Sequence, residues 1–69
     1  MLEFKFVPGK PVGHYLGNWD RFVNCRALFR NNEVVIAKVY APYIDVIDPS
    51  TGEYMEKVAN SAIVPLEHK

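Results

Sequence analysis

The chain is poor in cysteine and histidine: its 69 residues include one cysteine, Cys25, and two histidines, His14 and His68. A lone cysteine excludes an intrachain disulfide framework, and chains of this kind are typical of reducing, intracellular compartments. A structural zinc site needs about four nitrogen or sulfur ligands at paired spacings, which are missing. We therefore expect neither a metal site nor a cofactor.

Long apolar runs are also missing. None approaches the roughly 18 residues of a membrane-spanning helix. The first residues, MLE, have neither the basic start nor the apolar core of a secretory signal. We therefore expect a cytoplasmic protein with no membrane partner.

Net charge is absent as well, because eight basic residues balance eight acidic ones. This argues against a general nucleic-acid binder, which needs a basic excess. The charges are uneven, however: Met1–Asn32 carries five basic and two acidic residues, +3, and Glu33–Lys69 carries three and six, −3. Either the two halves neutralise each other across strands or the molecule has one basic face.

What the chain does have is a small globular composition, 49% hydrophobic, in a length that suits one domain. We place this domain at residues 1–66 and expect residues 67–69 to be a solvated tail. A core of this size rarely supplies more than about 3–5 kcal/mol of stability. The chain therefore depends for its stability on a well-packed β core, on self-association or on a larger partner.

The strongest pattern lies between Phe22 and Ala41, where apolar alternation continues on both sides of Asn31-Asn32. It predicts a β-hairpin with both asparagines in the positive-φ positions of a type I′ turn, so that Arg30 pairs with Glu33. The register predicts a core face that only Lys38 interrupts: Val23, Cys25, Ala27, Phe29, Val34, Ile36 and Tyr40. The opposite, mixed face carries Phe22, Asn24, Arg26, Leu28 and Arg30 beside Val35, Ala37 and Val39.

Before the hairpin, Leu2–Val7 alternates and is predicted to be a strand that ends at the Pro8-Gly9 turn. Lys10–Asn18 is predicted to be a long glycine-rich loop, anchored by Val12, Tyr15 or Leu16. The segment Asn18–Arg30 is predicted to be a strand, because its apolar residues would surround a helix on all sides. A helix there, with Asn18 as its N-cap, is the alternative.

After the hairpin, Tyr43–Asp48 and Glu53–Val58 are predicted to be strands around a turn at Asp48–Gly52. A four-residue loop would place Asp45 opposite Glu56, and a three-residue loop with a bulge at Gly52 would place it opposite Lys57. Cross-strand charge favours the second register. A tight turn at residues 59–61 and a short strand at Ala62–Leu66, with Pro65 near its end, close the chain.

These runs predict an all-β fold, a small five-stranded antiparallel barrel. If Asn18–Arg30 were helical, the fold would be α+β. An OB-like barrel is the second choice of architecture.

The closing Asn60-Ser61 turn followed by Ile63-Val64-Pro65-Leu66 resembles the end of SH3-like barrels. The runs at residues 25–29, 36–39 and 44–48 are loosely similar in spacing to a Tudor-type SH3-like barrel. The resemblance covers about two thirds of the chain and implies such a barrel. Tudor-type domains that bind methylated lysine or arginine use an aromatic cluster as a cation cage. The position after the hairpin turn is Val34-Val35 here, and Tyr40, Tyr43 and Tyr54 could form a different cluster.

Catalytic motifs are weak. A Cys25–His14 nucleophile pair needs a reactive thiol, yet Cys25 lies on the predicted core face, where an apolar setting raises its pKa. Asp45 with Asp48, and Glu53 with Glu56, form acidic pairs beside a turn, where carboxylates are usually solvated. We therefore predict no enzyme, and an active site formed only at an oligomer interface is the alternative.

The chain has nine aromatic residues, more than a small core needs, and tyrosine, tryptophan and arginine are enriched at interface hot spots. We predict a protein-interaction module, an accessory or modulator of a larger protein that binds a protein partner or itself. The predicted partner-binding residues are Tyr15, Trp19, Arg21, Arg26, Arg30, Tyr43 and Tyr54. The alternative is a nucleic-acid-binding barrel that uses Arg21, Arg26, Arg30, Lys38 and Trp19.

Overall fold

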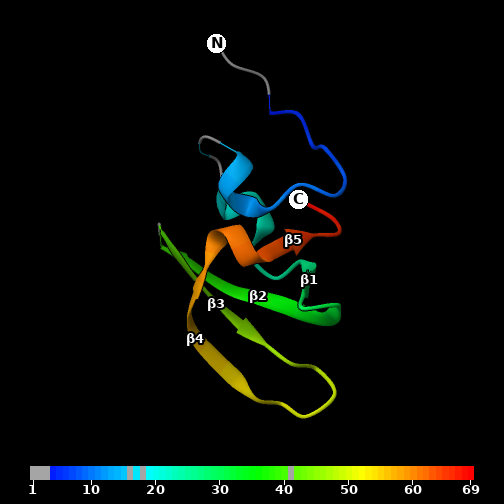
Figure 1. The fold of residues 1–69 in the computed structure, drawn as a ribbon, viewed down its shortest axis with the longest axis vertical. Helices are drawn as coiled ribbons and strands as arrows, with labels where there is room; N and C mark the ends of the chain where they lie inside the picture. The colour runs from blue at the N-terminus through cyan, green and yellow to red at the C-terminus, as the bar shows by residue number, and fades with distance from the viewer. Residues whose placement is uncertain (1–3, 16, 18, 41) are drawn as a thin grey trace.

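The fold is known from a computed structural model that describes residues 4–15, 17, 19–40 and 42–69 (Figure 1). Five antiparallel strands form one sheet in the order β4-β3-β2-β1-β5, so the all-β prediction is confirmed. The strands are β1 Arg26–Phe29, β2 Asn32–Tyr40, β3 Tyr43–Ile47, β4 Tyr54–Ala59 and β5 Ile63–Pro65. Three short 3-10 helices accompany them: η1 Val12–His14, η2 Trp19–Phe22 and η3 Asn60–Ala62.

The N-terminal segment is not a strand, so the prediction for Leu2–Val7 is wrong over its described part, Phe4–Val7. Phe4 and Phe6 pack against the core, which explains their alternation. No ladder partner is needed at Val7, because the Tyr15 hydroxyl accepts its N–H at 2.9 Å and donates to its carbonyl at 3.0 Å. Alternation therefore indicated burial here without strand pairing.

The segment after the glycine-rich loop divides into two elements, and over its described residues it forms neither one continuous strand nor one continuous α-helix. Trp19–Phe22 is the 3-10 helix η2, and β1 begins only at Arg26. Between them the chain reverses at Asn24, whose φ is 67°. Asn18 lies outside the described residues. Because of this reversal Phe22 is fully buried instead of lying on the mixed face.

The β1–β2 hairpin forms two residues out of the predicted register. Phe29 pairs with Asn32 and Ala27 with Val34, so Arg30 and Asn31 are the turn residues, with φ of 52° and 66°. Positive φ at both positions is the type I′ pattern that suits hairpins. A shift of two residues leaves the side chains of the paired stretch next to the turn on their predicted faces, so Cys25, Ala27, Val34 and Ile36 are buried as expected.

A β-bulge in β2 exchanges the two faces of the strand for the residues beyond it. Ile36 pairs with Val46 but Lys38 pairs with Asp45, so Ala37 is the extra residue. An extra residue exchanges the two faces beyond it. Val39 thus packs against the core and Tyr40 opposes Tyr43 on the other face, so the predicted core position of Tyr40 is wrong.

The β3–β4 hairpin contains both candidate registers. Next to the turn, Ile47 pairs with Tyr54 and Val46 with Met55, as the four-residue loop requires. Beyond a second bulge Ile44 pairs with Val58, as the alternative requires. The preferred register is therefore wrong at the turn and correct at the far end. Asp45 lies at the bulge where one register gives way to the other.

The core lies on the side of the sheet that η1 and η2 cover. It is built from one cluster of buried side chains: Val12, Tyr15, Phe22, Ala27, Val34, Ile36, Ile44, Val46 and Ile63. Val12 and Tyr15 anchor the glycine-rich loop as predicted, and Leu16 lies outside the described residues. The β3–β4 turn projects away from this end of the molecule (Figure 1).

Residues 67–69, which we predicted to be a solvated tail, include two exposed residues, His68 and Lys69, and also contact the body of the protein. The Lys69 amide donates to the Arg21 carbonyl at 2.8 Å, and the Glu67 carboxylate accepts the Arg26 amide at 3.2 Å. The His68 ring lies 5.1 Å from the ring of Phe4 and 5.0 Å from that of Phe6. These contacts join the two ends of the described chain.

Candidate functional site on the outer face of the sheet

The face of the sheet opposite the core carries a row of side chains across four strands. Arg26 pairs with Val35, Val35 with Ile47 and Ile47 with Tyr54, and side chains of paired residues share a face. Val35 and Ile47 are half-buried, while Arg26 and Tyr54 at the ends of the row are exposed. The row therefore connects β1 with the part of the sheet where the tyrosines gather.

Three tyrosines surround Asp45 at the β2–β3–β4 end of this surface, and we call Tyr40, Tyr43, Tyr54 and Asp45 the tyrosine face. Tyr43 is 42% exposed and Tyr54 is 49% exposed. The rings of Tyr40 and Tyr43, paired across β2 and β3, have centroids 6.4 Å apart. Large aromatic surface is thus presented to solvent from three adjacent strands.

The buried carboxylate of Asp45 fixes the positions of Tyr40 and Tyr54 by hydrogen bonding. Asp45 is only 6% exposed, yet its carboxylate is well satisfied. Tyr40 donates its hydroxyl to Oδ1 at 2.6 Å and Tyr54 donates to Oδ2 at 2.7 Å. The Lys57 amide, whose residue has a φ of 56° at the β4 bulge, donates to Oδ1 at 3.1 Å.

The two bulges make this arrangement possible. The bulge in β2 turns Tyr40 toward the face of Asp45, and the bulge in β4 turns the Lys57 amide inward. Bulges commonly re-aim side chains in this way. The like-charge contact of Asp45 with Glu56 that the four-residue loop implied is replaced by a backbone donor.

The hydrogen bonds shift the ionisation of all three partners. Donation by the Tyr40 hydroxyl lowers the pKa of Asp45, against an opposing desolvation, with further lowering by Tyr54, the Lys57 amide and the charge of Lys38. The same bonds raise the pKa of Tyr40 and raise that of Tyr54 to about 12, because a phenolate beside this carboxylate is disfavoured. The ionised carboxylate and the two neutral phenols stabilise one another.

A tyrosine titration tests this arrangement. We expect the Tyr54 ring signals to titrate near pH 12, whereas an ordinary phenol titrates near pH 10. The measurement is an NMR titration of the assigned tyrosine rings. In the control variant Asp45→Asn the Tyr54 pKa should return toward about 10. A Tyr54 pKa near 10 in the unmodified protein would contradict the hydrogen bond to Asp45.

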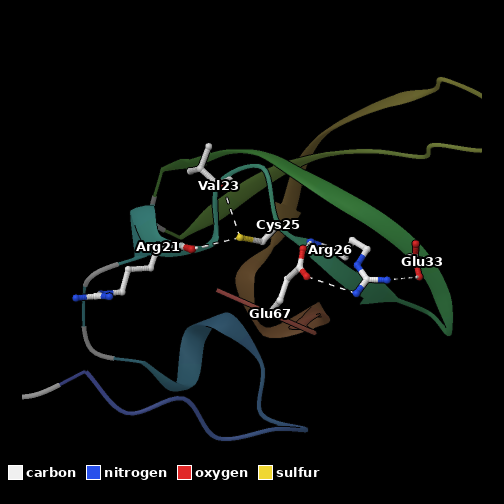
Figure 2. Close-up of polar contacts among 6 residues, drawn as sticks. All are labelled: Arg21, Val23, Cys25, Arg26, Glu33 and Glu67. Carbon is white, nitrogen blue, oxygen red and sulfur yellow. Dashed lines mark hydrogen bonds and ion pairs between the residues drawn. The ribbon is translucent and has the colours of Figure 1, made fainter. Parts of the chain in front are cut away.

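The predicted basic residues are dispersed and several are paired. Figure 2 shows the Arg26 guanidinium between Glu67, at 3.4 Å, and Glu33, at 4.0 Å. The amide of Arg26 also lowers the pKa of Glu67 by hydrogen bonding. Arg21 donates to the Lys69 carbonyl at 3.3 Å and lies over the Phe4 ring.

The other two cations lie elsewhere. Arg30 is in the β1–β2 turn, with its guanidinium 5.2 Å from the Phe29 ring centroid. Lys38 is exposed on β2, with Nζ 5.5 Å from the Tyr40 ring centroid. The five residues of the nucleic-acid hypothesis are thus divided among three places: Arg26 and Lys38 lie on the outer face of the sheet, Arg30 lies in the β1–β2 turn, and Trp19 and Arg21 lie in η2.

Two predicted partner-binding aromatics belong to the interior. Tyr15 is 6% exposed and is part of the core, so its prediction as a surface residue is wrong. Trp19 is half-buried against the core and its indole N–H donates to the Tyr15 carbonyl at 2.6 Å. Tyr43 and Tyr54, by contrast, are exposed as predicted.

Cys25 has a structural environment. Its thiol is buried and contacts the carbonyls of Arg21, at 3.4 Å, and Val23, at 3.7 Å (Figure 2). Burial raises the pKa of this thiol, and the charge of Glu67 raises it further. A raised pKa reduces the thiolate that a nucleophile needs. His14 lies in η1 with its ring against Tyr15.

Sequence reasoning named Tyr40, Tyr43 and Tyr54 as a possible cluster but missed Asp45, which it treated as a solvated carboxylate beside a turn. It also placed Tyr40 on the core face of the hairpin. The one available signal was Lys38, which interrupts the apolar alternation of β2 where the bulge occurs. A charged residue in a core register is evidence of a face change.

Within the described residues, no group of three or more histidine, cysteine, aspartate or glutamate side chains is placed to hold a metal ion. No helix over the same part of the chain is long and apolar enough to cross a membrane. No protein-family model matches the chain, and comparisons with curated proteins and with solved structures find no match.

Proposed function

We propose that this protein is an interaction module that binds a protein partner on the tyrosine face. The observation that carries the proposal is the pair of exposed rings, Tyr43 and Tyr54, beside a buried and fully hydrogen-bonded carboxylate. Tyrosine supplies large contact area with few rotatable bonds, and it is enriched at interface hot spots. Because Asp45 already orders Tyr40 and Tyr54, a partner would have less side-chain entropy to remove.

The edges of the sheet favour binding on a face. Of the two edge strands, β5 has three residues and ends in Pro65, and β4 carries a bulge at Lys57. Short strands, proline, bulges and lysine all discourage the addition of a further strand. The proposal therefore places the partner across β2–β4 and not along an edge.

The fold assignment that accompanies this proposal is SH3-like. The 3-10 helix η3 between β4 and β5, and the pairing of β5 with β1, support it. We also propose a non-enzymatic role in an intracellular setting, which the single free cysteine supports. The nucleic-acid alternative is disfavoured, since Arg26 is engaged by Glu67 and Glu33 and the remaining cations are dispersed.

Affinity capture from a lysate of the source, with and without nuclease, tests the proposal. The unmodified chain should retain a protein partner after nuclease treatment. Tyr43→Ala should reduce the retained amount roughly tenfold, the size of a hot-spot loss. The matched control is Leu66→Ala, since Leu66 is 41% exposed on another part of the molecule. Retention that disappears with nuclease, or equal retention by Tyr43→Ala, would contradict the proposal.

A further inference from the structure

We infer that the tyrosine face recognises a basic segment of its partner, one that presents arginine or lysine side chains to the rings of Tyr43 and Tyr54. This inference rests on the proposed function and specifies the chemistry of the partner. It comes from three properties of the face: its charge, the electronic state of its phenols, and the ammonium group of Lys38, which already lies over one of its rings.

The first property is charge. The hairpin from Tyr43 to Ala59 has four acidic residues, Asp45, Asp48, Glu53 and Glu56, and one basic residue, Lys57, for a net charge of −3. With Lys38 of the neighbouring strand β2 the charge of this region is −2. Glu53 and Glu56 are exposed. Their negative potential attracts a basic segment and repels an acidic one.

The second property is the state of the phenols. Tyr40 and Tyr54 direct their hydroxyl protons at the Asp45 carboxylate, at 2.6 Å and 2.7 Å. A phenol that donates to an anion is polarised, which makes its ring richer in electrons. The face of an electron-rich ring attracts ammonium and guanidinium groups. Asp45 is 6% exposed, so it acts through the rings and not as a direct ligand.

The third property is a cation–π contact that the chain makes with one of its own lysines. The ammonium of Lys38 lies 5.5 Å from the centroid of the Tyr40 ring and pairs in register with Asp45. A cation is thus already accommodated at one edge of the cluster. Tyr43 and Tyr54, which are 42% and 49% exposed, offer their rings to cations from outside.

Peptide titrations of the full chain test the inference. The probes are an arginine-rich peptide and its lysine, glutamate and leucine counterparts of equal length, followed by NMR of the assigned tyrosine rings. We expect the arginine and lysine peptides to shift the Tyr43 and Tyr54 signals, and Tyr43→Ala to raise the Kd about three- to tenfold. Added salt should weaken the binding.

Two charge variants give opposite expected signs. Glu56→Gln should raise the Kd of the basic peptides about two- to threefold, and Lys38→Gln should lower it by a similar factor. Both residues are exposed, so neither change should unfold the protein. Stronger binding of the glutamate or leucine peptide, no shift of the tyrosine rings with the basic peptides, or the same sign for both variants would overturn the inference.

The outcomes separate this inference from the proposed function. If Tyr43→Ala releases the captured partner but the basic peptides leave the tyrosine rings unchanged, the interaction surface stands and its basic specificity is wrong. If capture is unaffected by Tyr43→Ala and the tyrosine rings respond to none of the peptides, the proposed function itself is wrong.

Discussion

Replacing Phe22 with alanine is expected to unfold most of the protein at room temperature. The side chain is fully buried, and its ring centroid lies 5.1 Å from that of Tyr15 and 5.7 Å from that of Phe4. Truncating a buried phenylalanine costs about 3–5 kcal/mol. A domain of this size has about 3–5 kcal/mol in total, so the change removes nearly all of it.

Circular dichroism and urea denaturation measure this effect. The control is Leu66→Ala, whose exposed side chain should cost less than about 1 kcal/mol. A Phe22→Ala variant that keeps a cooperative transition with a free energy of unfolding close to that of the unmodified protein would refute the placement of η2 against the core.

Replacing Asp45 with asparagine is expected to lower the melting temperature by about 5–10 °C near neutral pH. The neutral side chain has the same shape but turns one acceptor into a donor. That donor faces a hydroxyl of Tyr40 or Tyr54 that now lacks its acceptor. Melting followed by circular dichroism gives the change, and Asp48→Asn is a matched control at the exposed turn. A larger loss for Asp48→Asn would contradict the role of Asp45.

The contribution of Asp45 to stability should also depend on pH. The pKa of Asp45 is lower in the folded protein, so its contribution is complete above the unfolded value, about 3.9, and is lost as pH falls through the folded pKa. The unmodified protein should therefore lose more stability between about pH 5 and 2 than Asp45→Asn loses. Asp48 and Glu67, whose pKa values are also lowered, contribute in both proteins and cancel in the difference. Parallel pH profiles would contradict the prediction.

Much of the fold follows from the sequence because strand patterning depends on local alternation. The runs at Tyr43–Asp48 and Ala62–Leu66, and the hairpin around Asn31, are visible as alternation bounded by turn residues. Alternation cannot, however, distinguish a paired strand from a segment that only packs. Phe4 and Phe6 show the resulting error at the N-terminus.

The candidate site was less predictable because it depends on two bulges. Each bulge shifts the register by one residue, and together they bring Tyr40 and the Lys57 amide to Asp45. Tyr54 reaches Asp45 from the regular part of β4. Neither bulge has a glycine or proline to mark it. Tyr43 and Tyr54 were nevertheless predicted as surface residues, because a small core has room for only some of nine aromatics.

The most direct test of the partner-binding surface is an NMR footprint of the captured partner on the full chain. Binding on the tyrosine face predicts that the largest shifts occur at Tyr40, Tyr43 and Tyr54 and their neighbours on β2–β4. Shifts confined to β5 and residues 67–69, with the three tyrosines unchanged, would contradict the account.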